Sequence, residues 1–200
     1  MKNVVGYVLF GHHNNTYMFE PGEPALPKCL GCGYRVDFFP HNPNYVFKKT
    51  FKPVSMEDVI ISKKTTALSA TYDGQWIVSK EFKKFCLQQG YKGLKFERFP
   101  EDTEHFQLII LPQVKFDVVR RETRFLNRCH VCGNYAEVIG ATPAFLQVSE
   151  PLADGFYSSD LLFGSGDGKH PLIIVGMETK AKLTAAKFKG LDFEPAYGLE

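Results

Sequence analysis

The chain has 200 residues, of which 44% are hydrophobic and 18 are phenylalanine, so it can bury a sizeable core and is unlike a disordered segment. Its formal net charge is only +2, which excludes a strong whole-chain attraction to nucleic acid or to an anionic membrane. The apolar run from Val4 to Phe10 is too short to cross a bilayer and lacks the flanks of a signal peptide, so we expect a cytoplasmic protein with reduced thiols.

The first fifty residues predict two β-hairpins. VVGYVLF (4–10) and TYMFE (16–20) flank GHHNN, and RVDFF (35–39) and NYVFKKTF (44–51) flank the turn sequence PHNPN. The pair His12-His13 could bind a metal, but no acidic or cysteine residue adjoins it, which favours a solvated turn.

Residues 76–97 predict a strand, a helix and a second strand. Ser79 is a good helix N-cap, and Gly90 is suited to the C′ position that ends a helix. Cys86 lies on the apolar stripe of the helix, where we expect an inert core thiol. Residues 94–97 alternate between apolar and charged, as in a half-buried strand.

The middle of the chain predicts another hairpin and a basic cluster. FQLIIL (106–111) and VKFDVV (114–119) flank Pro112-Gln113. This cluster of arginines could bind phosphate or an acidic protein, but such a run of basic residues is more typical of a solvated strand edge. Its members are Arg120, Arg121, Arg124 and Arg128.

The second half of the chain repeats part of the first. Residues 77–97 align with residues 174–194 without a gap at an offset of 97 (175 − 78), with 9 of 21 positions identical, and Leu183 takes the place of Cys86. Convergent helix–strand patterning is the alternative to common ancestry. We predict a tandem duplication: an α+β fold of two similar lobes (1–100 and 101–200) that pack as one compact unit, with antiparallel sheets and one helix per repeat, joined near residues 99–106.

A glycine-rich stretch, FGSGDGK (163–169), invites comparison with a phosphate-binding loop. A P-loop needs glycine at the position of Phe163 and serine or threonine at the position of His170. A P-loop also opens a helix, whereas this stretch precedes a predicted strand. The stretch therefore favours a hairpin turn.

Four of the five cysteines form two C-x-x-C-G motifs, 100 residues apart (129 − 29). The spacing of Cys29, Cys32, Cys129 and Cys132 suits one tetrahedral zinc ion. Two disulfides, a thioredoxin-like redox pair and a rubredoxin-like iron site are the alternatives. Each motif is followed by glycine and then, within two residues, by tyrosine (Tyr34 or Tyr135), which favours a metal knuckle over a helix start.

A site of four thiolates has no open coordination position, which indicates a structural ion, one per chain. Between Cys32 and Cys129 lie 96 residues (129 − 32 − 1), so this ion would join the two lobes. His130, between two ligands, is expected to be exposed. The sequence has no catalytic motif or carboxylate pair at catalytic spacing, so we expect a protein without enzymatic activity.

The two CxxCG motifs, together with SDLLFGSGDGKHPLIIV (159–175) and KFKGLDFEPA (187–196), resemble the bacterial double-CXXCG-motif proteins, which are grouped with immunity proteins of polymorphic toxin systems. The stretch IVSKEFKKFCLQQGYKGLKFERF (77–99) resembles a related, larger immunity-protein family. The resemblance covers about Cys29 to Pro195. It implies a stoichiometric inhibitor that binds a cognate toxin acting in the cytoplasm, with the four cysteines as a zinc site that holds the scaffold.

Two other classes of function stay open from sequence. A zinc-ribbon-like nucleic-acid-binding protein is compatible with the arginines and the abundant aromatic residues, although the small net charge makes nucleic acid an unfavourable partner. An enzyme with a structural zinc would need a pocket with convergent polar groups.

Overall fold

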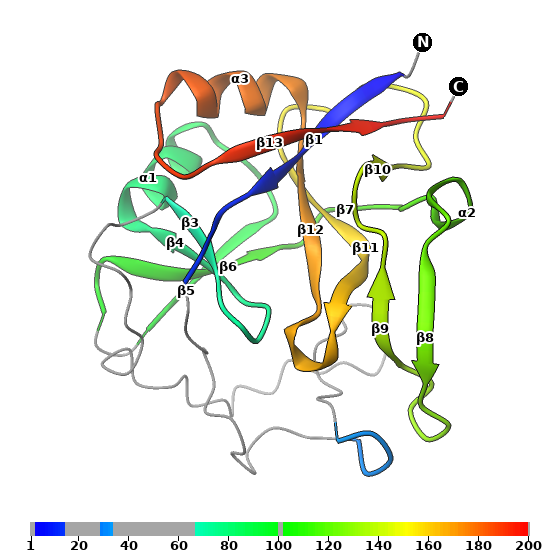
Figure 1. Cartoon of the computed structure of the whole chain (residues 1–200). Coiled ribbons are helices and arrows are strands. Elements are labelled where there is room, and N and C mark those ends of the chain that lie inside the picture. The colour runs from blue at the N-terminus through cyan, green and yellow to red at the C-terminus, as the bar shows by residue number, and fades with distance from the viewer. Residues whose placement is uncertain (1–2, 15–28, 34–66, 100–101, 200) are drawn as a thin grey trace.

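The computed structural model describes residues 3–14, 29–33, 67–99 and 102–199. Within these ranges the fold is α+β and mostly sheet, as predicted (Figure 1). One sheet has eight strands, which in spatial order are β10 (Ala144–Phe145), β13 (Asp192–Tyr197), β1 (Val4–Phe10), β12 (His170–Val175), β11 (Phe156–Ser165), β9 (Tyr135–Ile139) and β8 (Arg124–Arg128), with β7 (Gln113–Val114) pairing to β11. The other sheet has five, in the order β2 (His12–His13), β3 (Leu68–Ala70), β4 (Trp76–Ser79), β6 (His105–Ile110) and β5 (Leu94–Arg98).

In the described parts of the chain, three α-helices connect these strands: α1 (Lys80–Gln88), α2 (Val118–Arg121) and α3 (Met177–Ala185), and a 3₁₀ turn spans Gly166–Gly168. Most strand pairs are antiparallel, as expected. Among the strands described, the exceptions are three short parallel contacts, namely β2 with β3, β7 with β11 and β10 with β13.

Both predicted strand–helix–strand segments are confirmed, as β4–α1–β5 and β12–α3–β13. Ser79 caps α1 by accepting a hydrogen bond from the backbone N–H of Phe82 at 3.2 Å. Gly90, with φ of +70°, follows the helix in the left-handed conformation expected at C′. Cys86 and Leu183 are both buried, at equivalent places on the two helices.

The two segments also share a strand register. In each, one antiparallel strand lies between the two flanking strands: β6 lies between β4 and β5, and β1 lies between β12 and β13. Val78 is paired with Phe106 and Phe96 with Leu108; at the offset of 97, Val175 is paired with Tyr7 and Phe193 with Leu9. The middle strands therefore correspond, with Phe106–Leu108 of β6 in the place of Tyr7–Leu9 of β1. They differ in sequence order, because β6 follows its strand–helix–strand segment in the chain, whereas β1 precedes its own segment by more than 150 residues.

Side-chain contacts follow the same correspondence. The Lys83 ammonium lies 3.6 Å from the centroid of the Phe106 ring and 5.8 Å from that of Phe96. The equivalent Lys180 lies 5.3 Å from the centroid of Tyr7 and 6.0 Å from that of Phe193. Each helix thus places one lysine over two aromatic rings of its own unit, a favourable cation–π arrangement.

Apolar side chains cover both faces of the eight-stranded sheet. On one face, Leu9, Phe156 and Val175 pack with side chains of α1, α3 and the five-stranded sheet, including Phe82 and Leu183. On the opposite face a second cluster includes Val8, Phe116, Leu146, Phe163 and Ile174. The first cluster contains residues from both sheets, so one core joins them.

Two sequence predictions are wrong. Residues 106–111 and 114–119 do not form a hairpin, because β6 belongs to the five-stranded sheet, while β7 is paired with β11 in the other sheet and 118–121 is helical. The chain changes sheets at Pro112, whose carbonyl accepts a hydrogen bond from Ser158 N–H at 2.8 Å, and Asp117 caps the helix. His12 and His13 form the short strand β2 instead of a turn.

The second strand predicted at 16–20 and the hairpin predicted over 35–51 lie outside the described residues.

Candidate metal centre

The structure brings together the four cysteines that the sequence predicted as ligands. Cys29 Sγ lies 3.7 Å from Cys129 Sγ, and Cys32 Sγ lies 3.8 Å from Cys132 Sγ. All four sulfur atoms lie within 4.8 Å of one another. Each short distance joins one knuckle to the other, so the two motifs form one site despite their separation in sequence.

The two distances between the knuckles match the sulfur–sulfur distance that a tetrahedral ion requires. With Zn–S bonds of about 2.3 Å, the sulfur–sulfur edge of a regular tetrahedron is about 3.8 Å. A disulfide would bring two sulfur atoms to about 2.05 Å, and all five cysteines are free thiols in the structure. Among the described residues, this tetrad is the only group of three or more histidine, cysteine or acidic side chains placed to hold a metal ion.

The backbone of both knuckles turns in the same way. The N–H of Gly33 donates to the carbonyl of Cys29 at 2.8 Å, and the N–H of Gly133 donates to that of Cys129 at 2.9 Å. Gly33 and Gly133 have φ values of +72° and +76°, a left-handed conformation that glycine adopts without a Cβ penalty. The glycine of each C-x-x-C-G motif therefore has a specific backbone function.

Gly31 allows the two knuckles to approach closely. A Cβ at this position would lie 2.5 Å from Val131 Cγ2, 2.9 Å from Val131 Cβ and 3.2 Å from Cys129 Sγ. Its N–H donates to Cys29 Sγ at 3.3 Å. The first knuckle thus contacts the second through a residue that has no side chain.

Hydrogen bonds and burial give the thiols different acidities. The backbone N–H groups of Cys32 and Gly31 lower the pKa of Cys29 to about 6. Those of Cys132 and Val131 lower the pKa of Cys129, whereas burial raises the pKa of Cys132 to about 12. Two sulfur atoms, one per knuckle, are therefore stabilised as thiolates by the knuckle backbone, which suits metal ligation.

Lys169 also belongs to this region, and the sequence did not indicate it. The glycine-rich stretch that precedes it forms the turn between β11 and β12, as predicted, with Phe163 paired to His170. Lys169 is buried, and its Nζ donates to the carbonyl of Tyr135 at the start of β9. Burial lowers the pKa of Lys169, and the charges of Cys32, Asp167 and Cys132 oppose that lowering. No local sequence signal separates such a lysine from a solvated turn residue.

The remaining cysteine is not part of the site. Cys86 is 1% exposed, and burial raises its pKa to about 12, which confirms the inert core thiol predicted from its helical position.

The basic cluster is divided by the fold. Arg120 donates to the carbonyl of Gly198, and Arg121 donates to the carbonyl of Thr142 through Nε at 3.1 Å and through Nη2. Arg124 and Arg128 lie exposed on β8, the last strand of the eight-stranded sheet as described. His12, His13 and His130 are also exposed.

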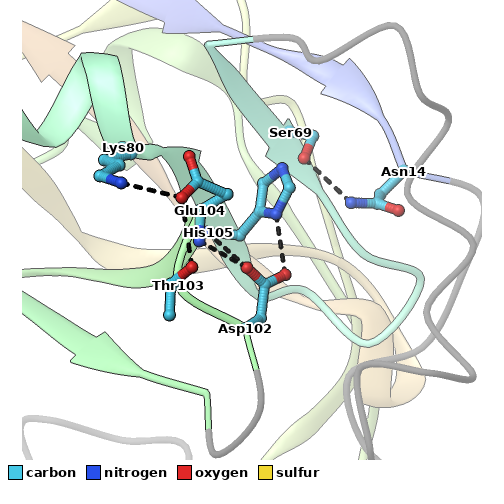
Figure 2. Close-up of polar contacts among 7 residues, drawn as sticks. All are labelled: Asn14, Ser69, Lys80, Asp102, Thr103, Glu104 and His105. Atoms are coloured by element: carbon cyan, nitrogen blue, oxygen red, sulfur yellow. Dashed lines mark hydrogen bonds and ion pairs between the residues drawn. The ribbon is translucent and has the colours of Figure 1, made fainter.

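A second polar network lies at the start of β6. Figure 2 shows the Asp102 carboxylate beside the His105 ring, with Asp102 Oδ2 at 2.8 Å from His105 Nδ1, and the Glu104 carboxylate at 2.8 Å from Lys80 Nζ. Asp102 Oδ1 also accepts from the backbone N–H groups of Glu104 and His105 at 2.7 and 2.9 Å. His105 Nε2 is buried with no hydrogen-bond partner among the described residues. The network is a turn capped by a side chain. We did not identify it from the sequence, although an aspartate three residues before a strand is a pattern that could have indicated it.

Within the described ranges, no helix has the length and apolar composition needed to cross a membrane.

Comparison of the chain with protein-family models, curated protein sequences and solved structures gave no match.

Proposed function

We propose that this chain is a cytoplasmic immunity protein that binds and neutralises a cognate bacterial toxin, with one structural zinc ion and no enzymatic activity of its own. The observation that carries the proposal is the cysteine tetrad, which draws residues 29–33 and the β8–β9 turn into one four-thiolate site. Four protein ligands leave no position for water or substrate, so the ion would hold a scaffold together.

Zinc is the ion that fits the tetrad best. Four thiolates at tetrahedral spacing suit zinc or iron, and we favour zinc because structural sites with four cysteine ligands are typical of it. Structural zinc in small peptides binds with about 10–16 kcal/mol of apparent free energy, comparable to the whole stability of a domain. The ion would therefore decide whether the first knuckle stays docked on the β8–β9 turn.

A tandem duplication accounts for the internal correspondence. Lys83 and Lys180, and likewise Gly90 and Lys187, lie at the offset of 97 and share a cation–π arrangement or a positive φ. Val78 and Val175 lie at the same offset and occupy the same register, although their partners Phe106 and Tyr7 on the middle strands are not separated by that offset. Convergent packing of a strand–helix–strand unit would give the same topology, but it would not require a lysine at the same helix position to lie over two aromatic rings in both units.

The inhibitory role rests on the resemblance of the two CxxCG motifs and of residues 77–99 to immunity proteins. An immunity protein needs a stable scaffold and a complementary surface, and it needs no catalytic group. A closed metal site that clamps distant segments is consistent with that requirement.

The test is neutralisation of a defined toxin. The toxin domain encoded beside this gene is expressed in a bacterial host with and without the chain, and complex formation is measured by native pulldown and by calorimetry with the purified pair. We expect restored growth and a complex of fixed stoichiometry. Continued toxicity together with no detectable complex would refute the proposal.

Nucleic-acid binding is the rival function, and the fold weakens it. Two of the four arginines on which it depends, Arg120 and Arg121, are engaged with backbone carbonyls. Electrostatic binding is strongest at low salt, so unchanged mobility of DNA and RNA under that condition would eliminate this rival.

A further inference from the structure

Each half of the sequence carries the same three elements in the same order. A middle strand comes first (β1 in 1–100, β6 in 101–200), a C-x-x-C-G knuckle second and a strand–helix–strand segment third. Tyr7 of β1 and Phe106 of β6 occupy corresponding places, so the offsets between the copies are 99 (106 − 7), 100 (129 − 29) and 97 (174 − 77). Because these offsets are nearly equal, β1 belongs to the first copy and β6 to the second.

The two halves exchange their middle strands. β1, from the first half, lies between β12 and β13 of the second half, and β6, from the second half, lies between β4 and β5 of the first. The registers agree along these strands: Glu97 is paired with Gln107, and the equivalent Glu194 is paired with Val8. Each half therefore donates one strand to the sheet of the other, as protomers do in a strand-exchanged dimer.

Side chains near the two helices make reciprocal contacts between the halves. The Phe188 ring lies against the Phe85 ring, with centroids 5.3 Å apart. At the offset of 97, Tyr91 is equivalent to Phe188, and Lys182 is equivalent to Phe85. The Lys182 ammonium lies 5.9 Å from the centroid of the Tyr91 ring. The same two positions thus meet twice, once in each direction, which is the property of a two-fold interface.

The cysteine tetrad has the same two-fold arrangement. Cys29 Sγ lies 3.7 Å from the sulfur of its equivalent, Cys129, and Cys32 Sγ lies 3.8 Å from that of its equivalent, Cys132. Atoms that lie close to their own equivalents are near the axis that relates the two halves. The candidate metal position therefore lies near this axis, with two ligands from each half.

We propose that the two halves of this chain associate as the protomers of a strand-exchanged dimer do, so that a second copy of the chain is a partner: the first half of each copy packs with the second half of the other. This inference rests on the tandem duplication and the metal site in the proposed function. Each metal site of the dimer would take Cys29 and Cys32 from one copy and Cys129 and Cys132 from the other.

The connection between the halves is the part of the described structure that exchange would change. β5 and β6 are paired as a hairpin, and six residues separate them (105 − 98 − 1). Asp102 caps the turn into β6, because its Oδ1 accepts from the backbone N–H groups of Glu104 and His105 (Figure 2). In the dimer this connection would run from one pair of halves to the other. The turn would open, while contacts within and between halves would be kept.

The first test uses two full-length copies that each lack one knuckle. One copy carries Cys29→Ser and Cys32→Ser, the other carries Cys129→Ser and Cys132→Ser, and each has a different affinity tag. The mixture is unfolded and then refolded with zinc at about 1 mM protein, because halves joined by a short connection have an effective concentration of about that order. Protein that carries both tags is isolated, and its mass and zinc content are measured beside wild type.

We expect dimers with both tags and one zinc ion per two chains, because exchange completes one four-cysteine site and leaves the other without cysteine. A control pair, in which both tagged copies carry Cys29→Ser and Cys32→Ser, should hold no zinc in this way. No dimer with both tags, or a dimer with no more zinc than the control pair, would overturn the inference. Wild-type protein that binds no zinc would instead reject the metal site, and the second measurement, which needs no metal, would decide the exchange.

The second measurement compares wild type, Asp102→Ala and the matched control Asp154→Ala by sedimentation equilibrium after refolding. Asp154 accepts hydrogen bonds from Thr179 and Lys182 within the second half, so monomer and exchanged dimer share these contacts. We expect Asp102→Ala to favour the dimer by about 10-fold for each turn that opens, about 100-fold in all, and Asp154→Ala to leave the monomer–dimer constant unchanged. Equal constants for Asp102→Ala and wild type, or no dimer in any of the three proteins, would overturn the inference.

Discussion

Gly31→Ala tests whether close contact between the knuckles sets the metal geometry. The added Cβ would meet Val131 Cγ2 at 2.5 Å and Val131 Cβ at 2.9 Å. The Cγ2 methyl can rotate away because Val131 is 57% exposed, but its Cβ moves only with the backbone. Since carbon atoms pack no closer than about 3.5 Å, and 3.5 − 2.9 leaves a deficit of about 0.6 Å, the knuckles must separate by that amount.

That separation exceeds what a tetrahedral site accepts, because metal–ligand distances vary by only about 0.2 Å around their usual values. We expect Gly31→Ala to weaken zinc binding by at least about 10-fold, equivalent to about 1.4 kcal/mol. Competition with a chelator measures the affinity. Gly155→Ala is the matched control, because its added Cβ would lie 3.9 Å from the nearest atoms, on the Tyr157 side chain.

A double variant identifies the cause. Val131→Gly removes both clashing atoms, so Gly31→Ala combined with Val131→Gly should bind zinc more tightly than the sum of the two single effects predicts. Wild-type affinity in Gly31→Ala, or strict additivity in the double variant, would show that the contact does not control the site.

Three further predictions follow from the described contacts. Cys129→Ser should abolish zinc binding and lower the melting temperature sharply, whereas Cys86→Ala should keep one zinc per chain, both checked by elemental mass spectrometry and thermal melts. Lys187→Gly should raise the free energy of unfolding by about 0.5–1 kcal/mol in denaturant titrations, because Lys187 has a φ of +55° and glycine relieves that strain; unchanged or lower stability would contradict this. Burial raises the pKa of Asp154, but its hydrogen bond from Lys182 contributes to a net lowering, so its stabilising contribution is present at neutral pH and is lost as the pH falls through the lowered pKa. The melting temperatures of wild type and Asp154→Asn should therefore begin to converge as the pH falls below about 3.9 and should come closest below the lowered folded-state pKa, and a constant difference down to pH 2 would refute this linkage.

Local sequence signals predicted the parts of the fold that depend on neighbouring residues. The N-cap at Ser79, the terminal glycine Gly90 and the apolar stripe containing Cys86 are each set within one or two helical turns. The cysteine tetrad was predictable because a zinc ion needs four ligands and the second C-x-x-C-G motif supplies the two that the first lacks, even though 96 residues separate Cys32 from Cys129.

The remaining features depend on long-range pairing. Nothing in the sequence of β6 indicates that it lies between β4 and β5, or that β1 takes the corresponding place in the other unit. The apparent hairpin around Pro112 was misleading because two strand patterns in succession do not specify a common sheet. The burial of Lys169 depends on knuckles and turns brought together only by the completed fold.

The place of β1 has a consequence for the order in which the protein matures during synthesis. The strands β3, β4, β5 and β6 are all present once residue 110 has left the ribosome, although the core against which they pack also needs Phe156, Ile173 and Leu183. β1 emerges first but is paired only with β12 and β13, which end at residues 175 and 197 (Figure 1). At about 5–20 residues per second, its apolar side chains therefore wait roughly 10–40 s for their partners. A ribosome-bound chaperone would have its longest opportunity to act on this strand, and a chain stalled before β12 would carry β3–β6 with an incomplete core and with β1 still unpaired.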